Sequence, residues 1–369
     1  MEERRAPQFA PVDLDLVPEV DALLTRLGMG PFRRTEVTAP PGRNDIWIGP
    51  TESGRHAFVK RLVGSPGNVR ERLDRLAAFE RARPAISPLH LRVPELLALE
   101  EATALCAFAH VDDAVPGYRL AEEGRFGPAL TGAAGRALGA VHASSAAELA
   151  VLDNSPPHMP DPRFLVGLPE GVYENLTMAE LDSWRMLQQD REVCLAIDAL
   201  CAAEGAAPKV PSHCDLRLDQ FLVVGEKLYV TDWEEFRLAD PARDIGNFVG
   251  QWLQQAMLDI VSGNGDSVFR GVDLTHEVIM ERGAAALRRQ RPLIERFWAA
   301  YRDQRGGADP GLAERATAFA GWHLLDRLLA AAGRSSRVAG IERAAAGVGR
   351  AALVRPERFA AALGLGEPS

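Results

Sequence analysis

The sequence predicts an α+β protein with two lobes, a smaller N-terminal lobe with an antiparallel sheet and a larger, mostly helical C-terminal lobe. A chain of 369 residues exceeds the size of one small core, which favours two domains. Strand-like segments gather before residue 110, at 36–48, 57–63, 93–99 and 104–108. From Leu120 onward, apolar residues follow helical spacing instead. We therefore place the domains at 1–110 and 111–369.

Composition excludes several classes of function. With 25% charged and 47% hydrophobic residues, the chain has the balance of a soluble globular protein. No apolar run approaches the length of a membrane span, and the N-terminus lacks the apolar core of a signal peptide. The net charge of −9 argues against binding to nucleic acid, which needs a basic face. We expect a cytoplasmic protein that binds neither membranes nor nucleic acid.

A lysine within an apolar strand is the first candidate for a functional residue. Lys60 lies in the segment 57–63, and a charge there needs an anionic partner, such as a nucleotide phosphate or a carboxylate on a neighbouring helix. An edge strand that turns the lysine toward water is the alternative. The amphipathic pattern within 12–30 predicts a helix that packs on this lobe, and 70–82 predicts a second one.

The segment 211–244 carries two acidic residues at the two ends of an apolar hairpin. Residues 221–224 and 228–231 form two short apolar runs separated by a Gly-containing turn, which predicts a β-hairpin. Asp215 precedes the first strand and Asp232 follows the second strand, with Gln220 between them on the Asp215 side. We expect the two carboxylates to lie close together, where they suit a hydroxyl proton and a Mg²⁺ ion. The alternative is that both only cap turns.

This segment resembles the catalytic segment of the aminoglycoside phosphotransferase-like kinases, a branch of the protein-kinase fold. The resemblance rests on His213-x-Asp215, an amide five positions after the Asp, the hairpin that ends in Asp232-Trp233-Glu234, and the run from Asp240 to Asp244. It implies a bilobal kinase-like fold. The chain from about residue 35 to 250 fits the same pattern, and the remaining helices fit the larger lobe.

The resemblance assigns a role to each polar residue of the segment. Asp215 is implied to accept the proton of the substrate hydroxyl, and His213 to brace the loop around it. Gln220 and Asp232 occupy positions of metal ligands. The family usually has Asn in place of Gln220 and Gly in place of Cys214. Gln keeps the amide oxygen but places it one methylene further out, which alters the geometry of a metal site.

The N-terminal lobe supplies the implied nucleotide site. Lys60 matches the ATP-binding lysine of the family, which pairs with an acid on the following helix. Glu71 is our choice for that acid and Glu80 the second. Gly42 and Asn44 are compatible with a turn that covers the phosphates with backbone N–H groups, although an ordinary Pro-Gly turn would look the same.

The C-terminal lobe holds two implied structural residues. The segment 133–143 resembles the long central helix of the family, which commonly ends in a pair such as Val141-His142, and we expect His142 to be a buried hydrogen-bonding residue. Asp244 corresponds to the Asp that ties the catalytic loop to the start of a helix. The Pro-rich segment 151–170 would either contact the acceptor or simply connect two helices.

Together these features imply a Mg²⁺- and ATP-dependent transfer of phosphate to a hydroxyl. For the acceptor, the chain resembles the kinase subunit of class V lanthipeptide synthetases, on the pattern of 40–45, 58–62, 243–253 and 318–329. That resemblance implies phosphorylation of Ser or Thr in a ribosomally made precursor peptide, followed by elimination on a separate lyase partner.

Two other functions stay open. The first is a kinase for a small molecule, with an aminoglycoside, macrolide, choline-like or sugar hydroxyl as the acceptor. The second is a catalytically weak pseudokinase that acts as a binding subunit, which Gln220, Cys214 and the short phosphate loop favour. Retention of Lys60, Asp215 and Asp232 argues against the second, because a scaffold has no need of all three.

Overall fold

The chain folds into two compact units. The computed structural model describes residues 12–144, 153–157, 162–262, 276–307, 309–335 and 337–366. The first unit consists of Met1–Val115 and Leu222–Phe236, and the second of Pro116–Phe221 and Arg237–Ser369. The segment Leu222–Phe236 therefore returns to the unit that contains the N-terminal strands. This return brings residues that are far apart in the sequence into one core.

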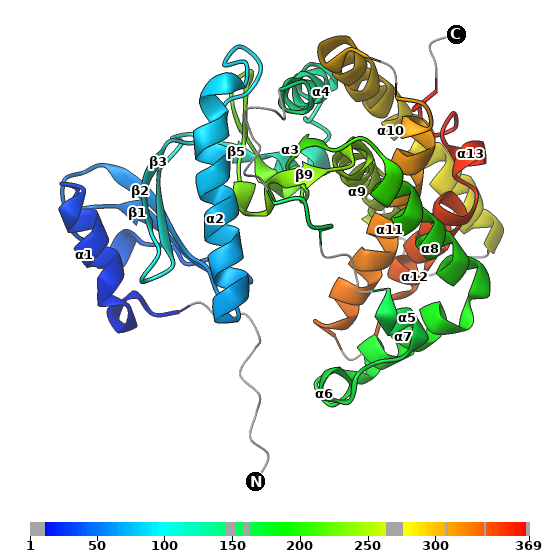
Figure 1. Ribbon diagram of the computed structural model, residues 1–369, viewed down its shortest axis with the longest axis horizontal. Coiled ribbons are helices and arrows are strands. Elements are labelled where there is room, and N and C mark those ends of the chain that lie inside the picture. Colours follow the sequence, from blue (N-terminus) through cyan, green and yellow to red (C-terminus); the bar gives the residue numbers. More distant parts are fainter. Residues whose placement is uncertain are drawn as a thin grey trace. The chain divides into compact units, whose positions relative to one another are not determined.

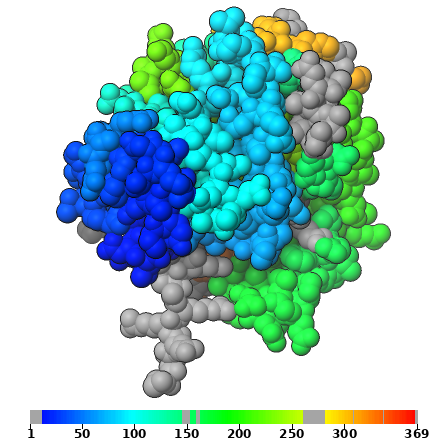
Figure 2. Space-filling model, turned by 60° about the vertical axis from the view of Figure 1, so that its left-hand side comes forward, coloured from blue at the N-terminus to red at the C-terminus, as the bar shows by residue number. Residues whose placement is uncertain are grey.

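A four-stranded antiparallel sheet forms the centre of the first unit. Its strand order is β1-β2-β4-β3, with β1 at Asp45–Pro50, β2 at His56–Arg61, β4 at Leu105–Ala109 and β3 at Leu96–Glu100. Figure 1 shows helix α1 (Pro18–Arg26) and helix α2 (Pro66–Ala82) on opposite faces of this sheet. Figure 2 shows the same unit from outside, with the dark-blue residues around α1 beside the lighter blue residues that include α2.

Successive side chains of β2 point alternately to an apolar face of the sheet and to the face that carries Lys60. Ala57 and Val59 are buried in the core that Leu23 and Leu24 of α1 share. Because successive side chains of a strand point to opposite faces, Lys60 lies on the face away from this core. Lys60 pairs in register with Ile46 of β1 and Cys106 of β4, so it occupies an interior strand. An edge-strand lysine that faces water is thereby ruled out.

The expected strand at 36–48 begins nine residues later than the sequence suggested. Residues Arg34–Glu36 form a 3₁₀ helix, and β1 starts only at Asp45. The run Pro40-Pro41-Gly42 explains the delay, because proline has no N–H for a sheet and glycine weakens a strand. Within the range expected to be a strand, Thr38 forms an isolated bridge with Ile48.

A β-hairpin completes the first unit, as the apolar runs on either side of Gly225 predicted. Strand β7 (Phe221–Val224) pairs with β8 (Lys227–Val230), and the 3₁₀ helix Trp233–Glu235 follows directly. Asp232 lies between them with φ at 66°. A left-handed conformation is uncommon for a residue with a side chain, and it turns the chain sharply at this carboxylate.

The second unit is mostly helical. Its short strands are β6 (Val210–Ser212) and β9 (Arg237–Ala239), which pair with each other. Its longer helices are α4 (Pro128–His142), α7 (Met178–Gln189), α8 (Arg191–Ala206), α9 (Pro241–Ser262), α10 (His276–Arg305), α11 (Leu312–Ala332) and α12 (Gly340–Val354). Its short helices are α3 (Gly117–Glu122), α5 (Arg163–Val166), α6 (Glu170–Tyr173) and α13 (Pro356–Phe359).

Helix α9 is the central helix of this unit. It packs against α10, α11 and α12. The apolar stripe predicted for it is buried at Ile245, Phe248, Val249, Trp252, Leu253 and Met257, whereas the side chain of Ile260 lies outside the described part. A Cβ on Gly246 would lie 2.3 Å from the Cβ of Phe319 and 2.6 Å from the carbonyl oxygen of Ala316. Only glycine allows α9 and α11 to approach this closely.

Within the described ranges, no helix is both long enough and apolar enough to cross a lipid bilayer.

Candidate active site

The charge of Lys60 is compensated by two carboxylates of the first unit. Its Nζ lies 2.5 Å from Oδ1 of Asp232 and 2.5 Å from Oε2 of Glu234. Burial by itself lowers the pKa of Lys60, but the two carboxylates outweigh burial and raise that pKa above its ordinary value. Lys60 is therefore a fixed cation next to residues 232–235, which directly follow the hairpin and are called the hairpin end below.

Glu234 is held in turn by a second buried cation. Arg72 of α2 is fully buried, and its Nη2 donates to Oε1 of Glu234 at 2.5 Å and to Oδ1 of Asn44 at 2.8 Å. The Nη1 of Arg72 donates to the carbonyl oxygen of Val63 at 3.1 Å. The backbone N–H of Val63 donates to the same Asn44 oxygen at 3.2 Å. Lys60, Glu234, Arg72 and Asn44 thus form one buried network.

Further contacts fasten helix α2 to the hairpin end. Arg75 donates to Oε2 of Glu235 at 3.2 Å. The rings of Phe79 and Trp233 stack with centroids 3.9 Å apart and planes 4° from parallel. Such aromatic pairs add stability beyond the area that they bury. Helix α2 therefore contacts each of the three residues that directly follow Asp232, from Trp233 to Glu235.

The prediction that Glu71, or else Glu80, pairs with Lys60 is wrong. Glu71 has 57% of its side chain exposed and pairs with Arg75 at 3.3 Å, whereas Glu80 pairs with Arg83 at 3.0 Å. Helix α2 turns arginines, not acids, toward the site, because the buried stripe of the helix includes Arg72. The partners of Lys60 come from the hairpin end instead, as Asp232 and Glu234.

Sequence reasoning missed Arg72, Glu234 and Arg75, although a signal was present. Arg72 and Arg75 lie three residues apart and alternate with the buried Leu73 and Leu76, so both fall near the apolar stripe of α2. Arginines in such a position require buried acids, and the pair Glu234-Glu235 supplies them.

The two residues proposed to cover the phosphates differ in their surroundings. Gly42 is exposed in the bend that precedes β1. Asn44 is buried, and its side chain is committed to Arg72 and Val63. Contact of this turn with a nucleotide therefore rests on its backbone groups, and it stays a prediction.

In the second unit, Asp244 fixes the loop that carries Asp215. The Oδ2 of Asp244 accepts the N–H of His213 at 2.7 Å, and its Oδ1 accepts the N–H of Cys214 at 2.7 Å. The N–H of Asp215 then donates to Nδ1 of His213 at 3.3 Å. The expectation that Asp244 ties this loop to a helix start is confirmed, since Asp244 lies in the first turn of α9.

His142 completes the support behind the loop, as a buried hydrogen-bonding residue. Its Nε2 lies 3.1 Å from Oδ2 of Asp244, and its Nδ1 lies 3.0 Å from the hydroxyl of Tyr301. Burial lowers the pKa of His142 despite the attraction of Asp244. Burial opposes ionisation of Asp244, but the hydrogen bonds from His142 and from the backbone N–H of His213 hold its pKa below the ordinary value. A neutral His142 that donates from Nε2 and accepts from Tyr301 fits both directions.

Cys214 has a left-handed backbone, with φ at 66°. This conformation costs about 1–2 kcal/mol for a residue with a Cβ. It explains why glycine suits this position in the family that the segment resembles. The loop reaches this shape here with a cysteine, held by the carboxylate of Asp244.

The predicted residues fall into two groups by unit. The first unit brings together Lys60 and Asp232, with Asn44 in the same network. The second unit holds Asp215, whose side chain is 39% exposed and lies 3.2 Å from Nη2 of Arg217, and Gln220, which is buried at the end of the 3₁₀ helix Leu218–Gln220. A shared metal site of Asp232 and Gln220 stays a prediction.

The chemistry of the donor set is compatible with a divalent cation that a nucleotide brings. Within the described ranges, no group of three or more His, Cys, Asp or Glu could hold a metal ion alone. Mg²⁺ is usually held by one or two carboxylates together with substrate phosphates and water. Asp232, with 26% of its side chain exposed, can serve as such a carboxylate beside Lys60.

Comparison with known proteins gives the class. Residues 45–269 match the phosphotransferase enzyme family. No curated protein sequence is similar enough to match. A choline/ethanolamine kinase family protein from Mesorhizobium loti shares 19% identity, with a TM-score of 0.51 over 95% of this chain and 99% of the other.

Two further solved structures have similar folds. The amicoumacin kinase hAmiN, in complex with AMP-PNP, Ca²⁺ and Ami, shares 11% identity with a TM-score of 0.53 over 94% of this chain and 96% of the other. An aminoglycoside phosphotransferase from Alicyclobacillus acidocaldarius shares 13% identity with a TM-score of 0.50 over 98% and 97%. The bilobal kinase-like α+β fold predicted from the sequence is confirmed. The chain belongs to the phosphotransferase enzyme family, which makes it an enzyme.

Loss of the Arg72 guanidinium should be severe. Arg72→Met leaves Glu234 buried without one of its two cationic partners, so we expect the free energy of unfolding to fall by about 3 kcal/mol or more. Arg70→Met on the same helix is the matched control, because Arg70 is 62% exposed. Adding Glu234→Gln to Arg72→Met should recover part of the loss. Denaturant unfolding measures all three, and equal effects of Arg72→Met and Arg70→Met would contradict the network.

Stability should decrease with acid below about pH 6.5. An unfolded histidine takes up a proton near that pH. The buried His142 and His323 have lowered pKa values and resist protonation until lower pH, so the unfolded state binds more protons there. The lowered pKa of Asp244 adds to the loss below about pH 4.

Denaturant unfolding at several pH values tests this dependence. His142→Gln should flatten the slope of unfolding free energy against pH, by up to about 1.4 kcal/mol per pH unit. His56→Gln, at an exposed position of β2, is the control and should leave the slope unchanged. A slope that His142→Gln does not alter would rule out a buried neutral histidine.

Proposed function

We propose that this protein transfers the γ-phosphoryl group of ATP to a hydroxyl group, with Mg²⁺ as the divalent cation. The observation that carries the proposal is the ion pair between the buried Lys60 and the partly exposed Asp232 in a chain of the phosphotransferase family. A fixed cation and a partly exposed carboxylate at one point are what Mg·ATP requires of a protein.

The residues of the first unit have distinct roles in the proposal. Lys60 binds phosphate oxygens, and its charge is secured by the two carboxylates beside it. Asp232 would hold the Mg²⁺ of Mg·ATP, and the ion would supply neutralisation of the charge that develops during transfer. The rest of the buried network, which consists of Glu234, Arg72 and Asn44, holds Asp232 and Lys60 in place. Gly42 lies in the turn that covers the phosphates with its N–H groups.

The second unit supplies the proton acceptor. Asp215 takes the proton of the attacking hydroxyl, and its partly exposed side chain leaves it accessible to an acceptor. His213 positions the backbone of Asp215 through its Nδ1. Gln220 provides an amide oxygen as a second ligand for the cation.

For the acceptor, we propose Ser or Thr of a ribosomally made lanthipeptide precursor, from which a separate lyase then eliminates phosphate. The support is the resemblance of the whole chain to the kinase subunit of class V lanthipeptide synthetases. A small hydroxylated molecule is the second candidate, favoured by the similarity of the fold to a choline/ethanolamine kinase family protein and to an amicoumacin kinase.

Two substitutions should separate the roles of the two acids. Asp215→Asn is expected to lower turnover by about 10²–10⁴-fold while nucleotide affinity stays largely unchanged, because it removes only the proton acceptor. Asp232→Asn should weaken the binding of Mg·ATP as well as turnover. Asp198→Asn, at an exposed position of α8, is the control.

Calorimetry measures the binding of Mg·ATP, and the mass of the precursor peptide reports the transfer of phosphate. A gain of one phosphate per modified Ser or Thr, or loss of water when the lyase is present, supports the peptide acceptor. Transfer only to small hydroxylated molecules favours the second candidate. A wild-type protein that neither binds Mg·ATP nor transfers phosphate would contradict both.

A further inference from the structure

A pocket lies in the second unit next to the loop that carries Asp215. Its volume is about 230 Å³, and its walls come from α9, α11 and α12 together with Tyr118, Arg217 and Asp219. Arg217 reaches from this wall to Asp215, with Nη2 of Arg217 3.2 Å from Oδ2 of Asp215. The pocket therefore begins one side chain away from the proposed proton acceptor.

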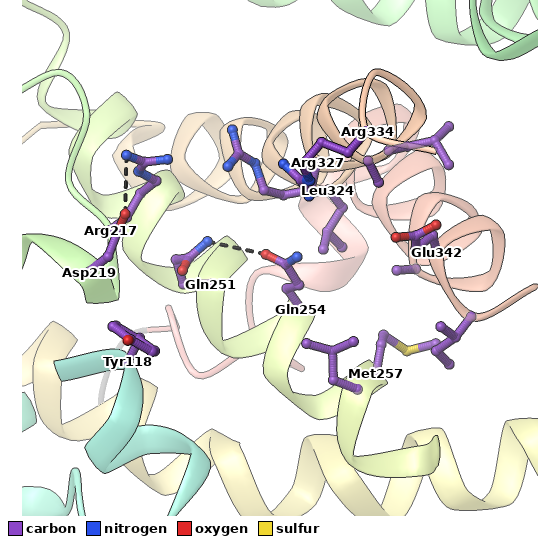
Figure 3. A pocket seen from close by; sticks show the side chains of 15 residues that line it. Tyr118, Arg217, Asp219, Gln251, Gln254, Met257, Leu324, Arg327, Arg334 and Glu342 are labelled. Carbon is purple, nitrogen blue, oxygen red and sulfur yellow. Dashed lines mark hydrogen bonds and ion pairs between the residues drawn. The ribbon is translucent and has the colours of Figure 1, made fainter. Parts of the chain in front are cut away.

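One side of the pocket is positively charged. Figure 3 shows Arg217, Arg327 and Arg334 along its upper side, with Gln251 and Gln254 below them. Two carboxylates, Asp219 and Glu342, also line the pocket, which leaves an excess of one positive charge.

Both of these carboxylates already have partners. Asp219 lies 3.3 Å from Arg217, and Glu342 accepts the N–H of Ala339 at 2.9 Å. The excess charge is thus on the helix α11 side, at Arg327 and Arg334.

These two arginines are available to a ligand to different degrees. Arg327 pairs at 2.5 Å with its neighbour Asp326, and both side chains are partly exposed, so the pair contributes little and can be exchanged. In the part of the chain that is described, no ion pair or side-chain hydrogen bond involves Arg334, which is exposed. A carboxylate in the pocket would meet two guanidinium groups, from Arg327 on α11 and from Arg334 just after the end of that helix.

His323 is buried beside the wall of the pocket. Burial lowers its pKa, and the charges of Arg327 and Arg217 lower it further. Its Nε2 lies 2.7 Å from Nε2 of Gln251, a residue of the pocket wall. The charges of these two arginines thus extend to a buried side chain behind the pocket wall.

The remaining walls are apolar, and the volume is small. Met257, Leu324, Leu328, Ile341 and Ala345 line them. Pockets for whole drug-sized ligands occupy about 300–1,000 Å³, so 230 Å³ suits one or two side chains better than an entire oligosaccharide. A methylene stem against these apolar residues, with a carboxylate at the arginines, matches a glutamate or aspartate side chain.

We propose that this pocket is a specificity subsite that binds an acidic side chain of a peptide acceptor, close to the Ser or Thr that is phosphorylated. The inference rests on the proposed function and adds a preference to it. An anionic subsite ligand also sets this enzyme apart from kinases whose acceptors are polycations, because like charges near the arginines would repel them.

Short capped peptides with a single Ser test the preference. In one set a Glu is moved along the chain on both sides of the Ser, and in matched sets Gln or Lys replaces that Glu. We expect kcat/KM to be about tenfold higher for the best Glu peptide than for its Gln counterpart, and lowest for Lys. Arg334→Gln should abolish the preference for Glu, mainly through KM, whereas Arg343→Gln, exposed on α12 outside the pocket, should retain it.

Binding of the best Glu peptide with Ala in place of Ser separates this inference from the proposed function. Binding that depends on Arg334, measured by fluorescence anisotropy, supports the subsite even if no peptide receives phosphate. Equal transfer to Glu, Gln and Lys peptides would overturn the subsite while leaving the phosphotransferase function intact. Transfer confined to small hydroxy acids would overturn it as well. Thermal unfolding of both variants verifies that they fold.

Discussion

Burial of the Lys60 ammonium is the constraint on which the first unit depends. A charge removed from water is tolerated only where opposite charges and hydrogen bonds compensate it. Asp232 and Glu234 supply that compensation, and the burial of Glu234 in turn calls for Arg72, which Asn44 also contacts. Each buried charge thus requires the next, and together they join β2, α2 and the hairpin end.

The same rule governs the second unit with the opposite sign. There the buried charge is the carboxylate of Asp244, and backbone N–H groups of His213 and Cys214 satisfy it. Those two hydrogen bonds dictate the path of the loop, including the left-handed backbone at Cys214. Asp215 is positioned because the residues just before it are fixed. In each unit a buried ion arranges a partly exposed carboxylate, Asp232 in one and Asp215 in the other.

The sequence predicted what local pattern and spacing encode. The hairpin, the need of Lys60 for an anionic partner, the buried role of His142 and the tie made by Asp244 all followed from short motifs or from the resemblance that they carry. The partner of Lys60 did not, because several acids lie on or near the helix and helical register alone cannot decide among them. Arg72 and Glu234 meet across 162 residues, a pairing that only the packing of α2 on the hairpin end reveals.

The late start of β1 has a simpler cause. Hydrophobicity across 36–48 indicated a strand, but two prolines and a glycine outweighed it locally. The proposed specificity subsite lay beyond sequence reasoning for a different reason. Arg327 and Arg334 look like ordinary surface residues in and just after α11 until the fold places them beside Arg217 and the loop of Asp215.

Hydrogen–deuterium exchange of the wild-type protein, with and without Mg·ATP, tests the central claim most directly, namely that the Lys60 network forms the nucleotide site. A ligand that binds the folded state suppresses local opening around its site. The account predicts slower exchange in 56–62 and 228–236 on addition of Mg·ATP, and unchanged exchange in α12. Unchanged exchange in both segments at saturating Mg·ATP would contradict it.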